Sequence, residues 1–253
     1  MKADGFYIHE IEHVSASSLN LWAAEPALWV LERLLKVRSP VGNAAHLGTA
    51  TELAVEQMLL EPNLSIDKAL VIAEGKFGEL VLDPDDRAEA GVKLRGMIEQ
   101  AIGQLRGYGK PDVPDDHRQH RVEVELEGVR VPCVGYTDFV FHTHGIVVDL
   151  KTSSTLPSAI KVSHARQGAV YAKAFGNYAM RFCYATPKKS SVYELENAAE
   201  HLKALANIAR RLERFLRVSD DPHELAAIVC PDYESFYWSS PIARANGFKQ
   251  FGF

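Results

Sequence analysis

Residues 135–152 read GYTDFVFHTHGIVVDLKT, and this stretch decides the fold. The apolar pattern around its first half predicts a strand over 129–142, and its second half predicts a short strand over 146–151. The His-Gly pair at 144–145 marks a turn between the two strands. The sequence therefore predicts an antiparallel hairpin with its tip at residues 143–144.

This hairpin would bring two carboxylates together. With the tip at 143–144, Asp138 and Asp149 lie opposite each other, with Cβ atoms about 4.5–5.5 Å apart. Lys151 follows two residues after Asp149 and points to the same face of the strand. A slip of one residue would change this pairing. Facing carboxylates repel each other unless a cation lies between them, so the pairing predicts a site for a hard divalent ion.

The Asp-X-Lys triplet has two interpretations when it is taken alone. Such a triplet at the end of a strand is more often solvated than catalytic, because short motifs are common. In a metal site, Lys151 would instead lie beside the metal-bound water or the scissile phosphate. There it would orient the nucleophile or stabilise charge in the transition state.

The rest of the chain predicts helices before the hairpin and both strands and helices after it. The N-terminal helices cover about 16–38, 44–60 and 84–106, whereas residues 61–83 have no clear pattern. A strand over 119–127 precedes the hairpin and would form a β-meander with it. The later elements are a helix at 164–175, strands at 179–186 and 190–195, and helices at 197–217 and 222–229.

This order of elements predicts a mixed α/β (α+β) fold, in which helices flank a central mixed sheet. We expect a single domain over residues 1–253. Within it, 1–110 would be a mainly helical N-terminal portion, 119–218 the catalytic core and 219–253 a C-terminal tail. The aromatic side chains of the tail would stack on unpaired bases or pack into a core or an interface.

The composition is that of a globular protein of 253 residues, with 47% hydrophobic residues, 24% charged residues and a net charge of −5. The negative charge disfavours non-specific coating of DNA but is compatible with an enzyme that has a basic groove. No apolar run reaches the roughly 20 residues of a membrane helix, and the N-terminus lacks a signal core. We therefore expect no membrane association and a cytoplasmic location, in a bacterium or a phage-infected host cell. The three cysteines are too far apart for a CxxC metal site.

Several short motifs follow one another in a fixed order along the first two thirds of the chain. They are S-A-S-S-L at 15–19, G-T-A-T-E at 48–52, G-Y-T-D at 135–138, V-D-L-K-T at 148–152 and Q-G-A-V-Y at 167–171. Together they resemble the PD-(D/E)XK nuclease superfamily, and most closely its RecB-like branch and the phage exonucleases of the RecE type. The resemblance implies a restriction-endonuclease-like core.

The resemblance also implies roles for individual residues. Asp138 and Asp149 would be the main metal ligands, joined by the backbone carbonyl of Leu150 and by Glu52. RecB-like relatives often have His where this chain has Glu52, which leaves its mode of coordination open. Lys151 would be the catalytic lysine.

Other residues would act around this centre. On the helix after the hairpin, the residues expected to contact DNA phosphate are Gln167, Tyr171, Arg166 and His164. Gln167 and Tyr171 could instead orient the lysine, and Tyr171 could equally be core packing. Glu123 and Glu125 would contact the metal ligands without binding the metal themselves, or would be part of a solvated strand face.

The implied activity is metal-dependent hydrolysis of DNA. Within that class we expect an exonuclease for recombination or repair that uses Mg²⁺, or alternatively Mn²⁺, with no iron–sulfur cluster and no nucleotide cofactor. Linear double-stranded ends would be the substrate. Such enzymes often form rings around DNA, so we expect a homo-oligomer, and a single-strand annealing protein is a natural partner. Two alternatives stay open: a structure-selective or sequence-specific endonuclease, and a non-catalytic DNA-binding or assembly protein with a nuclease fold.

Overall fold

The computed structural model of the chain describes residues 4–81, 83–114 and 119–252. The chain forms two compact units. Unit 1 comprises Met1–Pro40, Glu123–Gly135 and Asn197–Phe253, and unit 2 comprises Val41–Val122 and Tyr136–Glu196. The units do not follow the division that we expected near residue 110, and the single domain stays a prediction. No helix in the described ranges is long and apolar enough to cross a membrane.

Unit 2 contains a four-stranded sheet. Its strands, in spatial order, are β3 (Phe139–Phe141), β4 (Ile146–Thr152), β5 (Ala179–Ala185) and β6 (Ser190–Glu194). The β3–β4 and β5–β6 pairs are antiparallel, whereas β4 and β5 run parallel. The parallel pair requires a crossover, which α7 (Val162–Phe175) provides. The predicted mixed central sheet is confirmed.

The β3–β4 hairpin has the predicted register. Phe139 pairs with Val148 and Phe141 pairs with Ile146, as a tip at 143–144 requires. A short 3₁₀ turn, η3 (His142–His144), forms this tip. Gly145 closes it with φ of 62°, a left-handed conformation in which a side chain would be strained.

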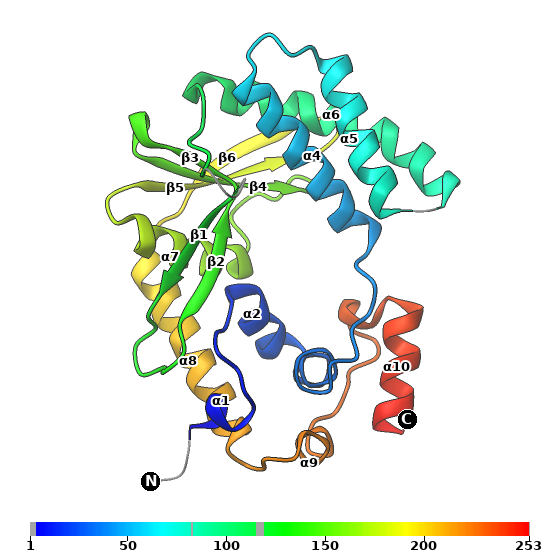
Figure 1. The fold of residues 1–253 in the computed structure, drawn as a ribbon, viewed down its shortest axis with the longest axis vertical. Coiled ribbons are helices and arrows are strands. Elements are labelled where there is room, and N and C mark those ends of the chain that lie inside the picture. Colours follow the sequence, from blue (N-terminus) through cyan, green and yellow to red (C-terminus); the bar gives the residue numbers. More distant parts are fainter. Residues whose placement is uncertain (1–3, 82, 115–118, 253) are drawn as a thin grey trace. The chain divides into compact units, whose positions relative to one another are not determined.

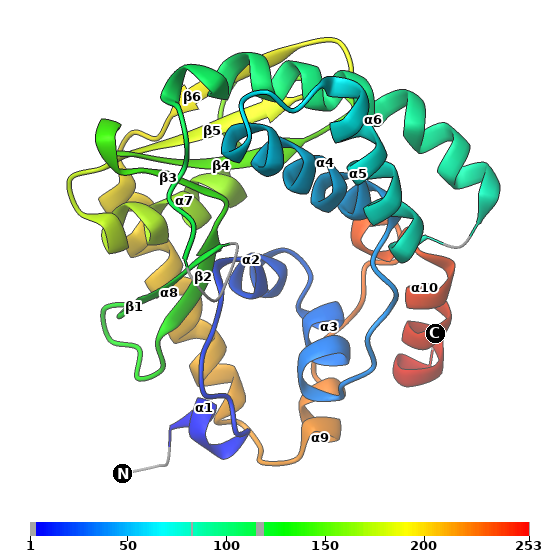
Figure 2. The same cartoon turned by 45° about the horizontal axis from the view of Figure 1, so that its top comes forward.

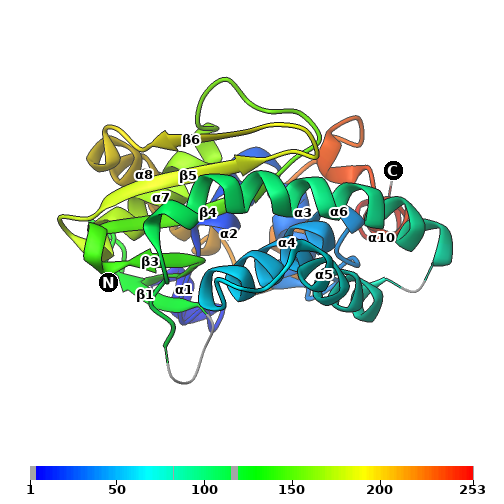
Figure 3. The ribbon, with the colours of Figure 1, turned by 90° about the horizontal axis from the view of Figure 1, so that it is seen from above.

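Helices cover both faces of this sheet. On one face lie α4 (Asn43–Leu60), α5 (Ile66–Leu80) and α6 (Pro84–Leu105), which share a hydrophobic core with alternate residues of β4, among them Val148 and Leu150. Figure 3 shows these three helices side by side. Helix α7 covers the opposite face, as Figures 1 and 2 show. There the backbone of Gly168 approaches the Phe182 ring so closely that an added Cβ would lie 2.7 Å from it.

Helix α5 lies in the segment that had no clear pattern. It begins at Ser65, whose hydroxyl accepts a hydrogen bond from the backbone N–H of Lys68, the usual role of a serine N-cap. Its buried positions are Ala69, Ala73 and Phe77, spaced by four residues along one face. Two of the three are alanine, so the apolar stripe is weak in the sequence.

Unit 1 is mainly helical. Its helices are α1 (Gly5–Ile8), α2 (Ala16–Ala24), α3 (Pro26–Trp29), η1 (Val30–Leu34), α8 (Ala198–Leu216), α9 (Pro222–Ala226), η4 (Phe236–Trp238) and α10 (Pro241–Phe251). The long helix α8 packs against α1 and α2. The absence of a side chain at Gly5 permits this contact, because a Cβ there would lie 2.4 Å from the Glu213 carbonyl oxygen. A second cluster joins Leu28 and Leu31 to Trp238 and Ala243.

Two local predictions were wrong. The helix expected over 16–38 is divided into α2, α3 and the π-helix η1, because Pro26 disfavours helical geometry at Glu25, where φ is −147°. The expected three-stranded meander does not form. Instead β1 (His120–Val124) and β2 (Cys133–Thr137) make a separate two-stranded sheet. In the predicted tail, the helix expected near 222–229 forms as α9, whereas α10 was not expected. Trp238 is buried, which fits the alternative that the aromatic side chains pack into a core.

Candidate active site

Strand β4 carries Asp149 and Lys151 on the face of the sheet that α7 covers. The alternation of a strand places them there because Val148 and Leu150 point into the opposite core. Asp149 is almost fully buried, with 1% of its side chain exposed, and Lys151 is 24% exposed. Lys151 Nζ lies 2.6 Å from Asp149 Oδ2, so the two residues form a buried ion pair.

Asp138 lies at the bend between β2 and β3. Its backbone lies outside both strands, and its side chain forms a hydrogen bond with the backbone of β4. Asp138 Oδ2 accepts a hydrogen bond of 2.7 Å from the backbone N–H of Leu150, the residue between Asp149 and Lys151. This bond holds the Asp138 side chain beside Leu150, next to the last paired residues of the hairpin, Phe139 and Val148. The position agrees with the predicted register, which places Asp138 opposite Asp149.

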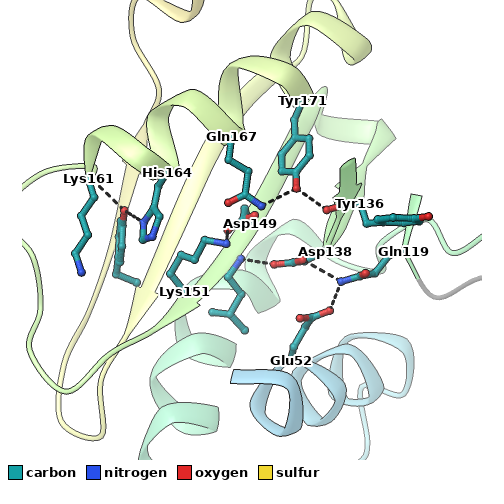
Figure 4. Close-up of polar contacts among 12 residues, drawn as sticks. Glu52, Gln119, Tyr136, Asp138, Asp149, Lys151, Lys161, His164, Gln167 and Tyr171 are labelled. Carbon is teal, nitrogen blue, oxygen red and sulfur yellow. Dashed lines mark hydrogen bonds and ion pairs between the residues drawn. The ribbon is translucent and has the colours of Figure 1, made fainter. Parts of the chain in front are cut away.

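Glu52 reaches the same place from α4. The side-chain amide of Gln119 lies between Glu52 and Asp138, as Figure 4 shows. Its Nε2 donates to Glu52 Oε1 at 2.6 Å and to Asp138 Oδ1 at 3.1 Å. Three carboxylates from α4, the β2–β3 bend and β4 are therefore brought together with Lys151. We call these four residues and Gln119 the carboxylate cluster.

The sequence did not point to Gln119. It is the first residue of the alternating stretch 119–127, where a polar side chain at the start of a strand is ordinary. Its contacts are with residues 67 positions earlier and 19 positions later in the chain. The signal that would have identified Gln119 is the closeness of its amide to two acidic motifs in space, and only the fold creates that closeness.

Burial controls the protonation of the carboxylate cluster. Desolvation raises the pKa of Glu52 to about 7, and the charge of Asp149 adds to the shift. Desolvation also raises the pKa of Asp138, together with the charges of Asp149 and Glu52. For Asp149, the desolvation that raises the pKa outweighs the opposing effect of Lys151. Burial favours the neutral form of Lys151, but the surrounding carboxylates raise its pKa overall, so it stays a cation.

Two residues of α7 lie above this cluster. Gln167 Nε2 donates to the hydroxyl of Tyr171 at 2.7 Å, and that hydroxyl donates to the Tyr136 carbonyl at 2.7 Å. In Figure 4 the Gln167 side chain points toward Asp149 and Lys151. Tyr171 is 2% exposed, and burial raises its pKa, so it is a neutral phenol that fixes the orientation of Gln167.

His164 is on the same helix but faces a different partner. Its Nδ1 lies 2.7 Å from the hydroxyl of Tyr184, and its ring stacks on the Tyr184 ring. Burial lowers the pKa of His164 to about 4, and the nearby charges of Lys151 and Lys161 act in the same direction. The ring is therefore neutral at physiological pH. Because Tyr184 pairs with Lys151 across β4 and β5, His164 packs beside the lysine.

The other predicted residues are Arg166, Glu123 and Glu125. Arg166 is half-buried on α7, but it lies on the side of the helix away from His164, Gln167 and Tyr171. Glu123 and Glu125 are exposed and belong to unit 1, whereas the whole carboxylate cluster belongs to unit 2. The expected contact of Glu123 and Glu125 with the metal ligands therefore stays a prediction.

The donor set of the cluster fits a hard divalent cation. All the ligands available from Glu52, Asp138 and Asp149 are carboxylate oxygens, and Asp149 Oδ1 is buried without a hydrogen bond among the described residues. As they stand, no three His, Cys, Asp or Glu side chains in those residues are grouped closely enough to hold a metal ion. The amide of Gln119 and the ammonium of Lys151 occupy oxygens that a cation would use.

Comparison with known proteins identifies the family. A model described as the PD-(D/E)XK nuclease superfamily matches residues 13–231, and the chain belongs to this superfamily. It is thus a nuclease by family, and such nucleases act on DNA and generally use divalent metal ions. No curated protein matches the chain. A solved structure titled "Crystal structure of SSO0001" is 16% identical, covers 78% of this chain and 85% of its own, and has a TM-score of 0.35.

Proposed function

We propose that this nuclease is a Mg²⁺-dependent exonuclease that degrades linear double-stranded DNA from its ends. One observation carries the assignment of the centre. The buried pair of Asp149 and Lys151 lies on a sheet face where two further carboxylates, from α4 and from the β2–β3 bend, converge. A solvated strand end would not bury an aspartate to 1% exposure.

The proposed roles follow from these positions. Glu52, Asp138 and Asp149 would hold the cation, with the Leu150 carbonyl as a further oxygen ligand. The cation would lower the pKa of a bound water and neutralise charge on the phosphate. Lys151, kept protonated by the carboxylates, would stabilise the negative charge that develops on the phosphate oxygens. Gln167, held by Tyr171, would orient Lys151 or the DNA phosphate.

Substitutions at the centre test this assignment. Lys151→Ala should lower Mg²⁺-dependent DNA degradation by at least about 100-fold, since it removes a charge aimed at the transition state. Asp149→Ala should abolish degradation, because it removes a ligand. Lys173→Ala is a matched control, since Lys173 is an exposed lysine on α7. Wild-type rates in the Lys151 and Asp149 variants would show that the centre lies elsewhere.

The preference for ends is the finer part of the proposal, and the resemblance to RecE-type exonucleases supports it. Linear duplexes labelled at the 5′ or the 3′ end, incubated with Mg²⁺ beside a covalently closed circle, test it directly. We expect release of label from linear DNA and an intact circle. Cutting of the circle at a comparable rate would make the chain an endonuclease with the same centre.

A further inference from the structure

The amide group of Gln119 occupies the position between two carboxylates where a cation would be expected. An amide nitrogen carries two hydrogens, and both are used here: one is directed at Glu52 and the other at Asp138. Figure 4 shows Gln119 between these two residues, with Lys151 on the far side of the Asp138 carboxylate. A neutral group thus holds together two acidic side chains that would otherwise repel each other.

The contacts leave little of Asp138 available for a cation. Its Oδ2 accepts from the Leu150 N–H, and its Oδ1 accepts from Gln119. A Mg²⁺ ion binds carboxylate oxygens at about 2.0–2.1 Å, which is shorter than the 2.6 Å between Gln119 Nε2 and Glu52 Oε1. An ion that bridged the same two oxygens would leave no room for the amide nitrogen between them.

We propose that Gln119 is a positioning residue that holds Glu52 and Asp138 in place in the metal-free protein and is displaced when the divalent cation binds. This inference rests on the proposed metal site. Without the Gln119 amide, the carboxylates of Glu52 and Asp138 would separate or draw in water. With it, they stay close together, but the incoming ion must break two hydrogen bonds to carboxylates, so Gln119 competes with the ion.

The competition predicts that removal of the amide destabilises the metal-free protein but strengthens its binding of the cation. Gln119→Leu keeps the size of the side chain and removes both donors. The metal-free variant should melt at a lower temperature than wild type, because two partly buried carboxylates lose their hydrogen bonds. Its dissociation constant for the cation should nevertheless fall by about tenfold, since charge-assisted hydrogen bonds no longer have to be broken. A merely structural residue would weaken both properties together.

The test is calorimetric titration of the full, metal-stripped chain with MnCl₂, combined with thermal melting in EDTA. Gln104→Leu is the matched control: Gln104 is an exposed glutamine of unit 2 that donates to Ser190, and its substitution should change neither measurement. If Gln119→Leu does not fold, Gln119→Asn replaces it, because the shorter amide cannot reach both carboxylates, and it should also bind Mn²⁺ more tightly.

The possible outcomes separate the two proposals. If wild type binds no Mn²⁺, or if Asp149→Asn binds it as tightly as wild type, the proposed metal site itself is wrong. If wild type binds Mn²⁺ through Asp149 but removal of the Gln119 amide leaves the affinity unchanged or weakens it, the metal site stands and the competing role of Gln119 is wrong.

Discussion

The charged side chains of Asp149 and Lys151 depend on each other, because both lie in a region with little access to water. Removal of one partner of a buried ion pair leaves an uncompensated charge. We expect Lys151→Met to lower the free energy of unfolding by about 3 kcal/mol in EDTA at pH 8. The double variant Asp149→Asn/Lys151→Met should recover most of that loss, as urea denaturation of the four proteins would show. Additive losses would mean that the pair does not interact.

The raised pKa of Glu52 predicts a pH-dependent stability of the metal-free protein. An unfolded glutamate loses its proton near 4.5 and the folded one near 7, so the folded state binds an extra proton between these values. Stability linked to Glu52 is therefore lost as the pH rises through this window. In EDTA, Glu52→Gln should be more stable than wild type by roughly 3 kcal/mol at pH 8 and about equally stable at pH 4.

Chemical denaturation across this pH range measures the difference. Glu99→Gln is a suitable control, because Glu99 is an exposed glutamate of α6 whose substitution should give a difference that does not grow between pH 4 and pH 8. A wild type that is as stable as Glu52→Gln at pH 8 would contradict the buried, desolvated state of Glu52.

The relative placement of single residues could be predicted where it depends on a local feature of the sequence. The hairpin register that faces Asp138 with Asp149 is confirmed for the paired residues of β3 and β4, because a tight turn fixes the pairing of its strands. Gln119 was missed because it meets its partners only through the fold. The same holds for Tyr184, which contacts His164 from a neighbouring strand and gives no motif in the sequence.

At the scale of elements, α7 depends on a glycine. An added methyl group at Gly168 would meet the Phe182 ring at 2.7 Å and the Leu195 side chain at 3.1 Å. Gly168→Ala should therefore cost about 1–3 kcal/mol of stability through overpacking. It should also reduce DNA degradation, because the neighbouring Gln167 would move away from Lys151.

A matched substitution separates packing from helix propensity. Gly103 lies in α6 with nothing within 4 Å of an added Cβ. Gly103→Ala should raise stability by up to about 1 kcal/mol, since alanine is the better helix former. Thermal melting of both variants gives the comparison. A similar gain at position 168 would show that α7 lies farther from β5 than the structure places it.

Elements were predicted best where their pattern was strong. The strands β4, β5 and β6 and the helices α4, α7 and α8 all lie within a few residues of their predicted ranges. Helix α5 was missed because its buried face contains mostly alanine. The meander was wrong because Asp138, which we placed within one continuous strand, is where the chain bends out of β2 and into β3.

At the scale of the whole molecule, the carboxylate cluster belongs entirely to unit 2. We therefore expect a bound divalent cation to protect unit 2 from hydrogen exchange more than unit 1. In hydrogen exchange measured by mass spectrometry, Mg²⁺ should slow exchange in peptides of α4 and of the β3–β4 hairpin and leave α8 nearly unchanged. Asp149→Asn should remove this protection. Equal protection of α8 would mean that the ion stabilises both units together.

The division into units could not be predicted because each unit is assembled from separated segments of the chain. Residues 123–135 belong to unit 1, although the residues on both sides of them belong to unit 2. No change in composition marks these crossings in the sequence. Local periodicity identifies a helix or a strand, but it does not say which core that element joins.

The contact of Gly5 with Glu213 has a consequence for synthesis of the protein. Their hydrogen bond joins residues 208 positions apart, so this contact of α1 can form only after α8 has been translated. Unit 2, by contrast, is complete at residue 196, and every residue of the carboxylate cluster precedes that point. Because domains fold as their segments leave the ribosome, the proposed nuclease centre has the opportunity to assemble first. A translational pause shortly before residue 198 would prolong the interval in which α1 and α2 lack their contacts with α8.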